Sequence, residues 1–301
     1  MHGRDVVSDR VDVEVDGYRV RVHIDGNSGP VVVLCSGLGG RQLHWSDTVA
    51  DLARDHTVVR FDRPGTPVAG TPTLNARRTV RGEAARIAAV LDTVAQRNSA
   101  VVVGHSVAGF YTEGFARLYP DRARALLLLD SSIAPDHPLL ALPGPAKLAA
   151  ADAAAALLDK SHLRTALGRA GLTLLQRRRP GGLDAGARYE IRSTAADPGL
   201  VTSLLTEYAA YHDLAAELCA LRADRPLPPV PRMVVTAHRG WRTQPWRARQ
   251  IRLAAALGAA HETIAPAGHL VMIEQPLRTA DVIRRIGRSA TENGAATSPR
   301  R

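Results

Sequence analysis

The sequence predicts an α/β fold with a mostly parallel, helix-flanked central sheet and a helical lid insertion. Short, continuously apolar runs alternate strictly with helical segments, which is typical of parallel strands joined by crossover helices. This alternation stops for about a hundred residues and then resumes, which indicates an insertion into one core. The chain has 301 residues, 45% of them hydrophobic and 23% charged, which suits one large soluble core with an accessory segment.

The first expected elements are an edge hairpin and a buried strand. Residues 11–24 alternate apolar and polar side chains on both sides of Asp16-Gly17, the dipeptide that a two-residue hairpin prefers. We therefore expect an antiparallel hairpin at one edge of the sheet. Residues 30–35 are continuously apolar and end in a glycine-rich segment at 36–40, so we expect a buried strand that runs into a loop.

The pattern of strands and helices then continues along the chain. The expected elements are a helix at 45–54, a strand at 57–62, a helix at 77–95, a strand at 100–104, a helix at 107–119 and a strand at 123–130. After the insertion follow a strand at 232–236, a helix at 246–257, a strand at 262–264 and a helix at 275–288. The core therefore comprises residues 1–133 and 230–288, with a helical lid or cap at 134–229. Residues 289–301 are rich in small and polar side chains, and we expect a disordered tail.

Charge and cysteine usage exclude several classes of protein. The net charge is +10, but the arginines are spread over every expected element without interleaved aromatic residues, so we expect no nucleic-acid partner. The arginine cluster at 177–179 is interpreted as a solvated helix end. Cys35 and Cys219 lie too far apart in the sequence for a disulfide framework or a metal-ligand spacing. Since we find neither a leader-like start nor an apolar run of about 18 residues, we expect a cytoplasmic protein without a membrane span.

A tight turn between a buried strand and a helix carries the first candidate for chemistry. In residues 101–110 the turn is centred on Ser106, and it requires small residues two positions away on either side, where Gly104 and Ala108 stand. This segment resembles the nucleophile elbow of the α/β-hydrolase superfamily, in its serine esterase-like and lipase-like branch, although the family usually has glycine in place of Ala108. The resemblance implies that Ser106 is the nucleophile and that the Val107 N–H helps to bind an oxyanion. The alternative is that Ser106 only caps the helix.

The glycine-rich segment at 36–40 corresponds to the loop from which the family supplies a second oxyanion donor. The resemblance assigns this role to the N–H of Leu38. The family usually has His-Gly here and a tryptophan several residues later; this chain keeps Gly37 and Trp45, which we assign to the substrate site, and has Ser36 in place of the histidine. The alternative is a simple turn. Residues 62–65 also resemble the family, where this segment shapes the wall of the site, and we expect a structural role for them.

The general base and its acid partner are expected on later loops. Residues 265–276 resemble the histidine loop of the family, which implies that His269 is the base, because an imidazole titrates near neutrality. The family most often places the acid after the first strand beyond the insertion, but residues 237–246 contain no carboxylate. Some members place it after the strand that follows the nucleophile helix, where this chain has Asp130. We therefore expect Asp130 as the acid, with Asp136 as the fallback; alternatively, Asp130 only caps the strand end.

The resemblance implies a serine hydrolase that cleaves an ester, thioester or related carbonyl substrate through an acyl-enzyme on Ser106, with no metal and no cofactor. A serine nucleophile argues against haloalkane dehalogenases and epoxide hydrolases, which use aspartate. Lactonases, carbon–carbon bond hydrolases and cofactor-free haloperoxidases share the serine site, and the motifs do not separate them.

The composition of the insertion bears on the substrate. Its leucine, alanine and tyrosine content suggests a small apolar acyl or ester-type substrate, with Tyr208 and Tyr211 either lining the pocket or packing the lid onto the core. The alternative in another class is a non-catalytic small-molecule-binding protein on the same fold, which the missing acid after the late strand would favour. No oligomeric state follows from the sequence.

Overall fold

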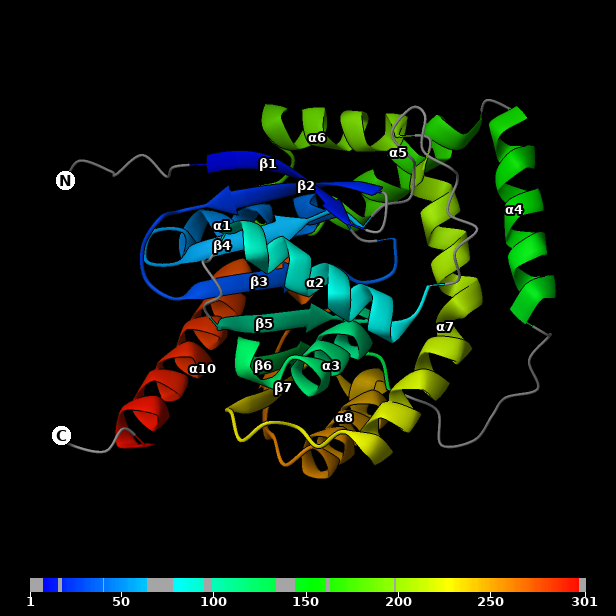
Figure 1. Cartoon of the computed structure of the whole chain (residues 1–301). Helices are drawn as coiled ribbons and strands as arrows, with labels where there is room; N and C mark the ends of the chain where they lie inside the picture. Colours follow the sequence, from blue (N-terminus) through cyan, green and yellow to red (C-terminus); the bar gives the residue numbers. More distant parts are fainter. Residues whose placement is uncertain are drawn as a thin grey trace.

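A mostly parallel sheet forms the centre of the molecule (Figure 1). The computed structural model describes residues 8–15, 18–39, 41–63, 78–94, 99–133, 144–160, 163–197 and 199–297. Eight strands form one sheet in the order β1-β2-β4-β3-β5-β6-β7-β8 among these residues. The strands are β1 (Ser8–Val15), β2 (Tyr18–Asp25), β3 (Val31–Cys35), β4 (Thr57–Phe61), β5 (Ala100–His105), β6 (Ala123–Leu129), β7 (Arg232–Ala237) and β8 (Ala260–Ile264). Only the pairs β1–β2 and β2–β4 are antiparallel, so the predicted fold class is confirmed.

Helices cover both faces of this sheet. The described helices are α1 (Ser46–Leu52), α2 (Val80–Val94), α3 (Ala108–Leu118), α4 (Gly144–Lys160), α5 (Leu163–Gln176), α6 (Ala185–Ala196), α7 (Gly199–Asp224), α8 (Gln244–Ala256), α9 (Val271–Glu274) and α10 (Pro276–Thr297). Side chains of α2, α3 and α8 join the hydrophobic core on one face, and those of α1, α9 and α10 join the core on the other. Successive strand residues alternate between the two cores: Val102 belongs to the first, Val101 and Val103 to the second. Because both faces are buried, these strands are continuously apolar in sequence.

The antiparallel hairpin lies at the sheet edge, as expected. Its register pairs Val15 with Tyr18, and the two residues between them, Asp16 and Gly17, lie outside the described part of the chain.

The tail prediction is wrong for residues 289–297, because α10 continues to Thr297. The stretch contains one glycine, no proline and three alanines, and its propensity is sufficient to extend a helix that is already nucleated on the core. The remaining residues, 298–301, lie outside the described part.

Four described helices, α4 to α7, lie between β6 and β7. α4 packs along α7, and α5 packs against α6. In Figure 1, α4 and α7 lie beside the end of the sheet toward which β5 points, and α6 is drawn above β1. α7 also reaches the core, where Leu214, Leu218 and Leu221 are buried at helical spacing. The first residues of the expected insertion, 134–143, lie outside the described part.

Candidate active site

The turn between β5 and α3 holds Ser106 in a strained backbone conformation. Ser106 has a φ of 54°, in the left-handed region that a residue with a side chain rarely adopts. The turn is so tight that a Cβ on Gly104 would lie 2.2 Å from Thr112 Oγ1 and 2.7 Å from the Ala108 carbonyl oxygen. Glycine is therefore required at position 104, whereas Ala108 fits, fully buried, at the start of α3. The strain presents the Ser106 hydroxyl at the carboxyl end of the sheet.

Three side chains from separate loops form a continuous chain of hydrogen bonds at this turn. Ser106 Oγ lies 3.0 Å from His269 Nε2, and His269 Nδ1 lies 2.6 Å from Asp130 Oδ2. Because a carboxylate only accepts, Nδ1 carries the proton and Nε2 is left to accept from the serine hydroxyl. His269 is half exposed, while the Asp130 side chain is buried. The structure thus brings together the three residues that the sequence predicted for the triad.

Asp130 directly follows β6 and has a φ of 43°. Its second oxygen, Oδ1, accepts from the Ala237 N–H at 3.1 Å and from the Trp246 indole N–H at 2.8 Å. Sequence reasoning missed both donors. They come from the end of β7 and the start of α8. Residues 237–246, which lack the carboxylate that the family most often has there, therefore supply the N–H groups that orient Asp130. Asp136 lies outside the described residues.

The histidine beside Ser106 supports the loop of His269. His105 Nε2 is hydrogen bonded to the carbonyl oxygen of His269 at 2.8 Å, and the two ring centroids are 4.7 Å apart. Burial and, second, the neighbouring His269 hold the pKa of His105 well below its ordinary value, against the raising effect of that hydrogen bond. His105 is therefore neutral near pH 7.

The loop after β3 passes directly beside Ser106. A Cβ on Gly37 would lie 2.8 Å from Ser106 Cβ and 2.9 Å from His105 Nδ1, so this close approach requires glycine. Leu38, which follows, lines the cavity in front of Ser106. Val107 follows Ser106 and is the N-cap residue of α3. The two expected oxyanion donors thus belong to segments adjacent to the serine.

A cavity of about 590 Å³ opens in front of Ser106. Its lining residues are Gly37, Leu38, His44, His105, Ser106, Leu174, Leu175, Arg178, His269, Leu270 and Glu274. Sequence reasoning missed His44, Leu270 and Glu274, and the residues from the end of α5 and just beyond it. Leu174, Leu175 and Arg178 carry no local sequence signal, because helix packing alone brings them here.

Two of the missed residues form an ion pair at the cavity wall. Arg178 Nη1 lies 3.2 Å from Glu274 Oε1, so this member of the expected solvated arginine cluster makes a specific contact within the cavity wall. Glu274 also accepts from Arg239 and, at 2.9 Å, from the Gly268 N–H. The pair joins the segment after α5 to the histidine loop.

A model of the alpha/beta hydrolase family matches residues 32–282. The chain belongs to the alpha/beta hydrolase family. Over 107 residues, this alpha/beta hydrolase is 31% identical to the protein named "Putative carbamate hydrolase RutD" from Pseudomonas savastanoi pv. phaseolicola; the match covers 36% of this chain and only 40% of the relative's length.

Solved structures of other hydrolases share the fold. The enol-lactonase from Burkholderia xenovorans LB400 has a TM-score of 0.65 and 22% identity, over 92% of this chain and 99% of that chain. An epoxide hydrolase from Vigna radiata has a TM-score of 0.69 and 18% identity, over 93% and 98% of the two chains. The family match shows membership of the alpha/beta hydrolases, while the structural likeness at this identity concerns the fold.

In this alpha/beta hydrolase the three aromatic residues expected in the substrate site lie elsewhere. Trp45 is fully buried in the core, and its indole N–H donates to Ser36 Oγ at 3.0 Å, so it supports the loop after β3 rather than lining the cavity. Tyr211 packs against Phe110 with ring centroids 5.5 Å apart, which fits the alternative of packing onto the core. Tyr208 is 70% exposed. The described cavity wall contains none of them.

His44 contributes a buried neutral imidazole to the cavity wall. Burial lowers its pKa to about 4, and only Asp62 opposes this shift. Among the described residues, no cluster of three potential ligands is suited to a metal ion, and no helix has the length and apolarity to cross a membrane.

Proposed function

We propose that this chain is a serine hydrolase that cleaves an ester, thioester or related carbonyl substrate through an acyl-enzyme on Ser106. The observation that carries the proposal is the hydrogen-bond chain from Ser106 Oγ through His269 to Asp130, at 3.0 and 2.6 Å. This arrangement lets an imidazole take the serine proton while a carboxylate stabilises the resulting imidazolium.

The reaction proceeds in two halves. In the first, His269 Nε2 takes the hydroxyl proton as Ser106 Oγ attacks the substrate carbonyl, and the N–H groups of Leu38 and Val107 stabilise the oxyanion. The carbonyl re-forms, His269 gives its proton to the leaving group, and the acyl group stays on Ser106. In the second half, His269 activates a water that attacks the acyl-enzyme, and Ser106 regains its proton as the acid product leaves.

The substrate is proposed to be a small apolar acyl or ester-type molecule. Four leucines line the cavity: Leu38, Leu174, Leu175 and Leu270. A volume of about 590 Å³ is in the range of small-molecule sites. Two of these leucines come from α5, so we assign residues 134–229 to a lid or cap over a core of residues 1–133 and 230–288.

The alternatives differ in how the structure bears on them. The non-catalytic binding protein has one argument, the missing acid after β7, and the bond of Asp130 to His269 supports catalysis instead. Lactone hydrolysis and carbon–carbon bond cleavage would use the same serine and stay within the proposed chemistry. A test must therefore establish the serine first and the substrate second.

Labelling with a fluorophosphonate probe tests the proposal. We expect the native protein to gain one adduct, located on Ser106 by peptide mass spectrometry, and to hydrolyse p-nitrophenyl esters over a range of acyl lengths. Ser106→Ala should lose both, whereas Ser289→Ala, a serine on α10 whose hydroxyl bonds to Arg285, should retain both. A native protein that neither labels nor hydrolyses any ester or lactone would overturn the proposal in favour of binding alone.

A further inference from the structure

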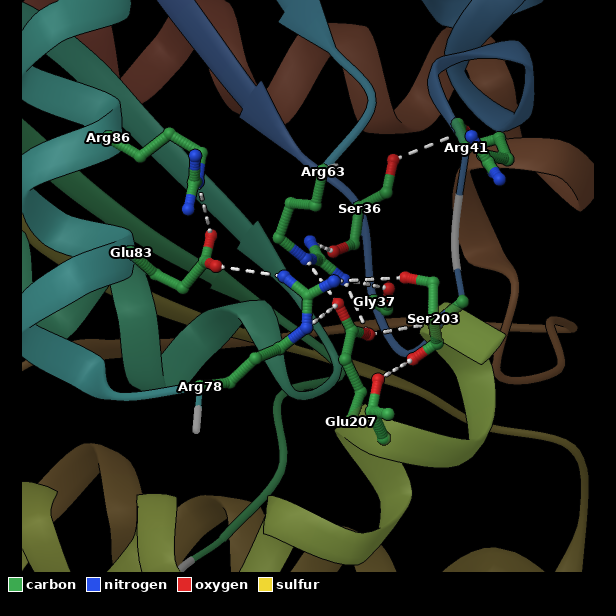
Figure 2. Close-up of polar contacts among 11 residues, drawn as sticks. Ser36, Gly37, Arg41, Arg63, Arg78, Glu83, Arg86, Ser203 and Glu207 are labelled. Carbon is green, nitrogen blue, oxygen red and sulfur yellow. Dashed lines mark hydrogen bonds and ion pairs between the residues drawn. The ribbon is translucent and has the colours of Figure 1, made fainter. Parts of the chain in front are cut away.

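A buried network of charged side chains connects α7 to the loop beside Ser106 (Figure 2). Its members, all no more than 8% exposed, are Arg63, Arg78, Glu83, Arg86 and Glu207. Arg78 pairs with Glu83 at 3.0 Å and with Glu207 at 3.4 Å, and Glu83 also pairs with Arg86 at 3.3 Å. Burying a charge is costly unless an opposite charge and hydrogen bonds compensate it, so these side chains must keep the relative positions in which they pair.

Glu207 is the member that α7 contributes, and it is fully buried. Its carboxylate accepts from Arg63 Nε at 2.7 Å and from Arg63 Nη2 at 3.0 Å. It also accepts from the Gly39 N–H at 3.0 Å. Burial alone would raise the pKa of Glu207, but Arg63 and Arg78 lower it well below the ordinary range, so the carboxylate is charged.

Arg63, which is bonded to Glu207, also donates hydrogen bonds to the loop after β3. Its Nη2 donates to the Gly37 carbonyl oxygen at 2.5 Å, and its Nη1 donates to the Ser36 carbonyl oxygen. Together, Arg63 and Glu207 therefore bind backbone groups of Ser36, Gly37 and Gly39, on both sides of Leu38. A planar guanidinium with several donors is suited to hold two carbonyl oxygens and a carboxylate at once.

The geometry of a peptide unit connects these bonds to the N–H of Leu38. The carbonyl of Gly37 and the N–H of Leu38 belong to one planar peptide group, which is trans here. In a trans peptide the two groups point in opposite directions. With the Gly37 oxygen held by Arg63, the Leu38 N–H points away from Arg63, and Leu38 itself lines the cavity that contains Ser106.

We propose that Arg63 and Glu207 are positioning residues that hold the Gly37–Leu38 peptide in the orientation in which the Leu38 N–H can bind the oxyanion. Because Glu207 belongs to α7, the orientation of the Leu38 N–H depends on the position of α7 relative to the loop after β3. The inference rests on the proposed serine acyl transfer, and it adds a role for two residues that do not line the cavity.

Substitution of Glu207 by glutamine tests the role. Glu207→Gln keeps the shape but removes the charge, which leaves Arg63 free to turn from the carbonyls. Losing an oxyanion donor outright costs about 10²- to 10³-fold in kcat, so a misaligned one should cost about 10- to 100-fold, with KM nearly unchanged. Affinity for a trifluoromethyl ketone, which forms an oxyanion adduct on Ser106, should fall by the same factor. Affinity for the matching secondary alcohol, which forms no adduct, should not change.

Glu113→Gln is the matched control. Glu113 is also a buried glutamate, held by Arg117 on α3 and by Arg222 on α7 at 2.7 Å each, but it makes no contact with the loop after β3 among the bonds described. Its loss should lower the thermal unfolding temperature as much as Glu207→Gln does while kcat stays within about twofold of the native value. A purely structural role for Glu207 predicts the same result for both variants.

Arg63→Lys is a second test of the positioning role, to be used if Glu207→Gln does not fold. Lysine keeps the charge next to Glu207, but one ammonium cannot bind both carbonyls as the guanidinium does. We expect the same fall in kcat and in ketone affinity, measured per folded molecule. If the native protein labels at Ser106, values of kcat and of ketone affinity in the folded variants within about twofold of those of Glu113→Gln would overturn the positioning role. A native protein that does not label would instead contradict the proposed function.

Discussion

Asp130 Oδ2 lies 2.6 Å from His269 Nδ1, although 139 positions separate the two residues in the chain. The family most often places the acid after β7, and β6 is the neighbour of β7 in the sheet. A carboxylate after β6 can therefore also reach the histidine loop that follows β8. The Ala237 N–H and the Trp246 indole then hold the other carboxylate oxygen. Among the described carboxylates, this bond distinguishes Asp130 as the proposed partner of His269.

Replacement of Asp130 by asparagine should lower kcat for an ester substrate by about 10³- to 10⁴-fold, because an amide N–H facing Nδ1 favours the wrong histidine tautomer. Steady-state hydrolysis of a p-nitrophenyl ester measures the loss. Asp136→Asn, the fallback acid of the sequence analysis, serves as the control and should leave kcat within about twofold. The reverse pattern would transfer the acid role to Asp136.

His44 should make the stability of the protein depend on pH. Its pKa is lowered by burial to about 4, whereas an imidazole in the unfolded chain has a pKa of about 6.5. Between these values the unfolded state binds a proton that the folded state does not. The stabilisation is therefore complete above about pH 6.5 and is lost as the pH falls toward 4, by up to about 3 kcal/mol.

Urea unfolding of the native protein and of His44→Gln, at pH 7.5 and pH 5, measures this dependence. The free energy of unfolding should fall less in the variant than in the native protein over this range. Equal decreases in the two proteins would show that His44 binds its proton as readily in the folded state as in the unfolded state.

The sheet and the turn around Ser106 could be predicted because their constraints are local. A strand buried on both faces must be continuously apolar, as residues 101–103 are, and a strained turn around Ser106 tolerates only small neighbours such as Gly104. Such constraints leave a mark within a few residues of sequence. The alternation of strands and helices predicted a mostly parallel sheet flanked by helices, whereas His269 and Asp130 were assigned through the family resemblance.

The cavity wall and the buried charges could not be predicted, because distant packing decides them. Tyr208 and Tyr211 lie three positions apart on α7, yet Tyr208 points into solvent and Tyr211 packs against Phe110. Arg63 and Glu207 are 144 positions apart, and no periodicity reveals that they pair. For the same reason the sequence assigned residues 62–65 a structural role without identifying what Arg63 holds.

Substitution of Gly104 by alanine should both destabilise the protein and abolish ester hydrolysis. The new Cβ would lie 2.2 Å from Thr112 Oγ1 and 2.7 Å from a backbone oxygen of α3, so the turn that presents Ser106 must shift. Overpacking of this kind costs about 1–3 kcal/mol. Urea unfolding and ester turnover measure the two effects.

Gly171→Ala is the control for that substitution. Gly171 lies within α5, and a Cβ there meets no heavy atom within 4 Å among the described residues. Alanine should therefore stabilise the protein by up to about 1 kcal/mol and leave turnover unchanged. If Gly104→Ala behaves like Gly171→Ala, the turn is looser than its close contacts indicate.

Enlarging Leu174 should shorten the acyl chain that the enzyme prefers. Leu174 lies at the end of α5 and lines the cavity, so Leu174→Trp fills space that a longer acyl chain would occupy. Each methylene that no longer finds an apolar contact costs about 0.8 kcal/mol, or about fourfold in kcat/KM. The measurement is kcat/KM across p-nitrophenyl esters from acetate to decanoate, with Leu167→Trp as the control, because Leu167 is an exposed leucine of the same helix outside the described cavity wall. A shift of the preferred length in Leu174→Trp alone would place the acyl group against α5, whereas identical profiles for both variants would direct it to another part of the cavity.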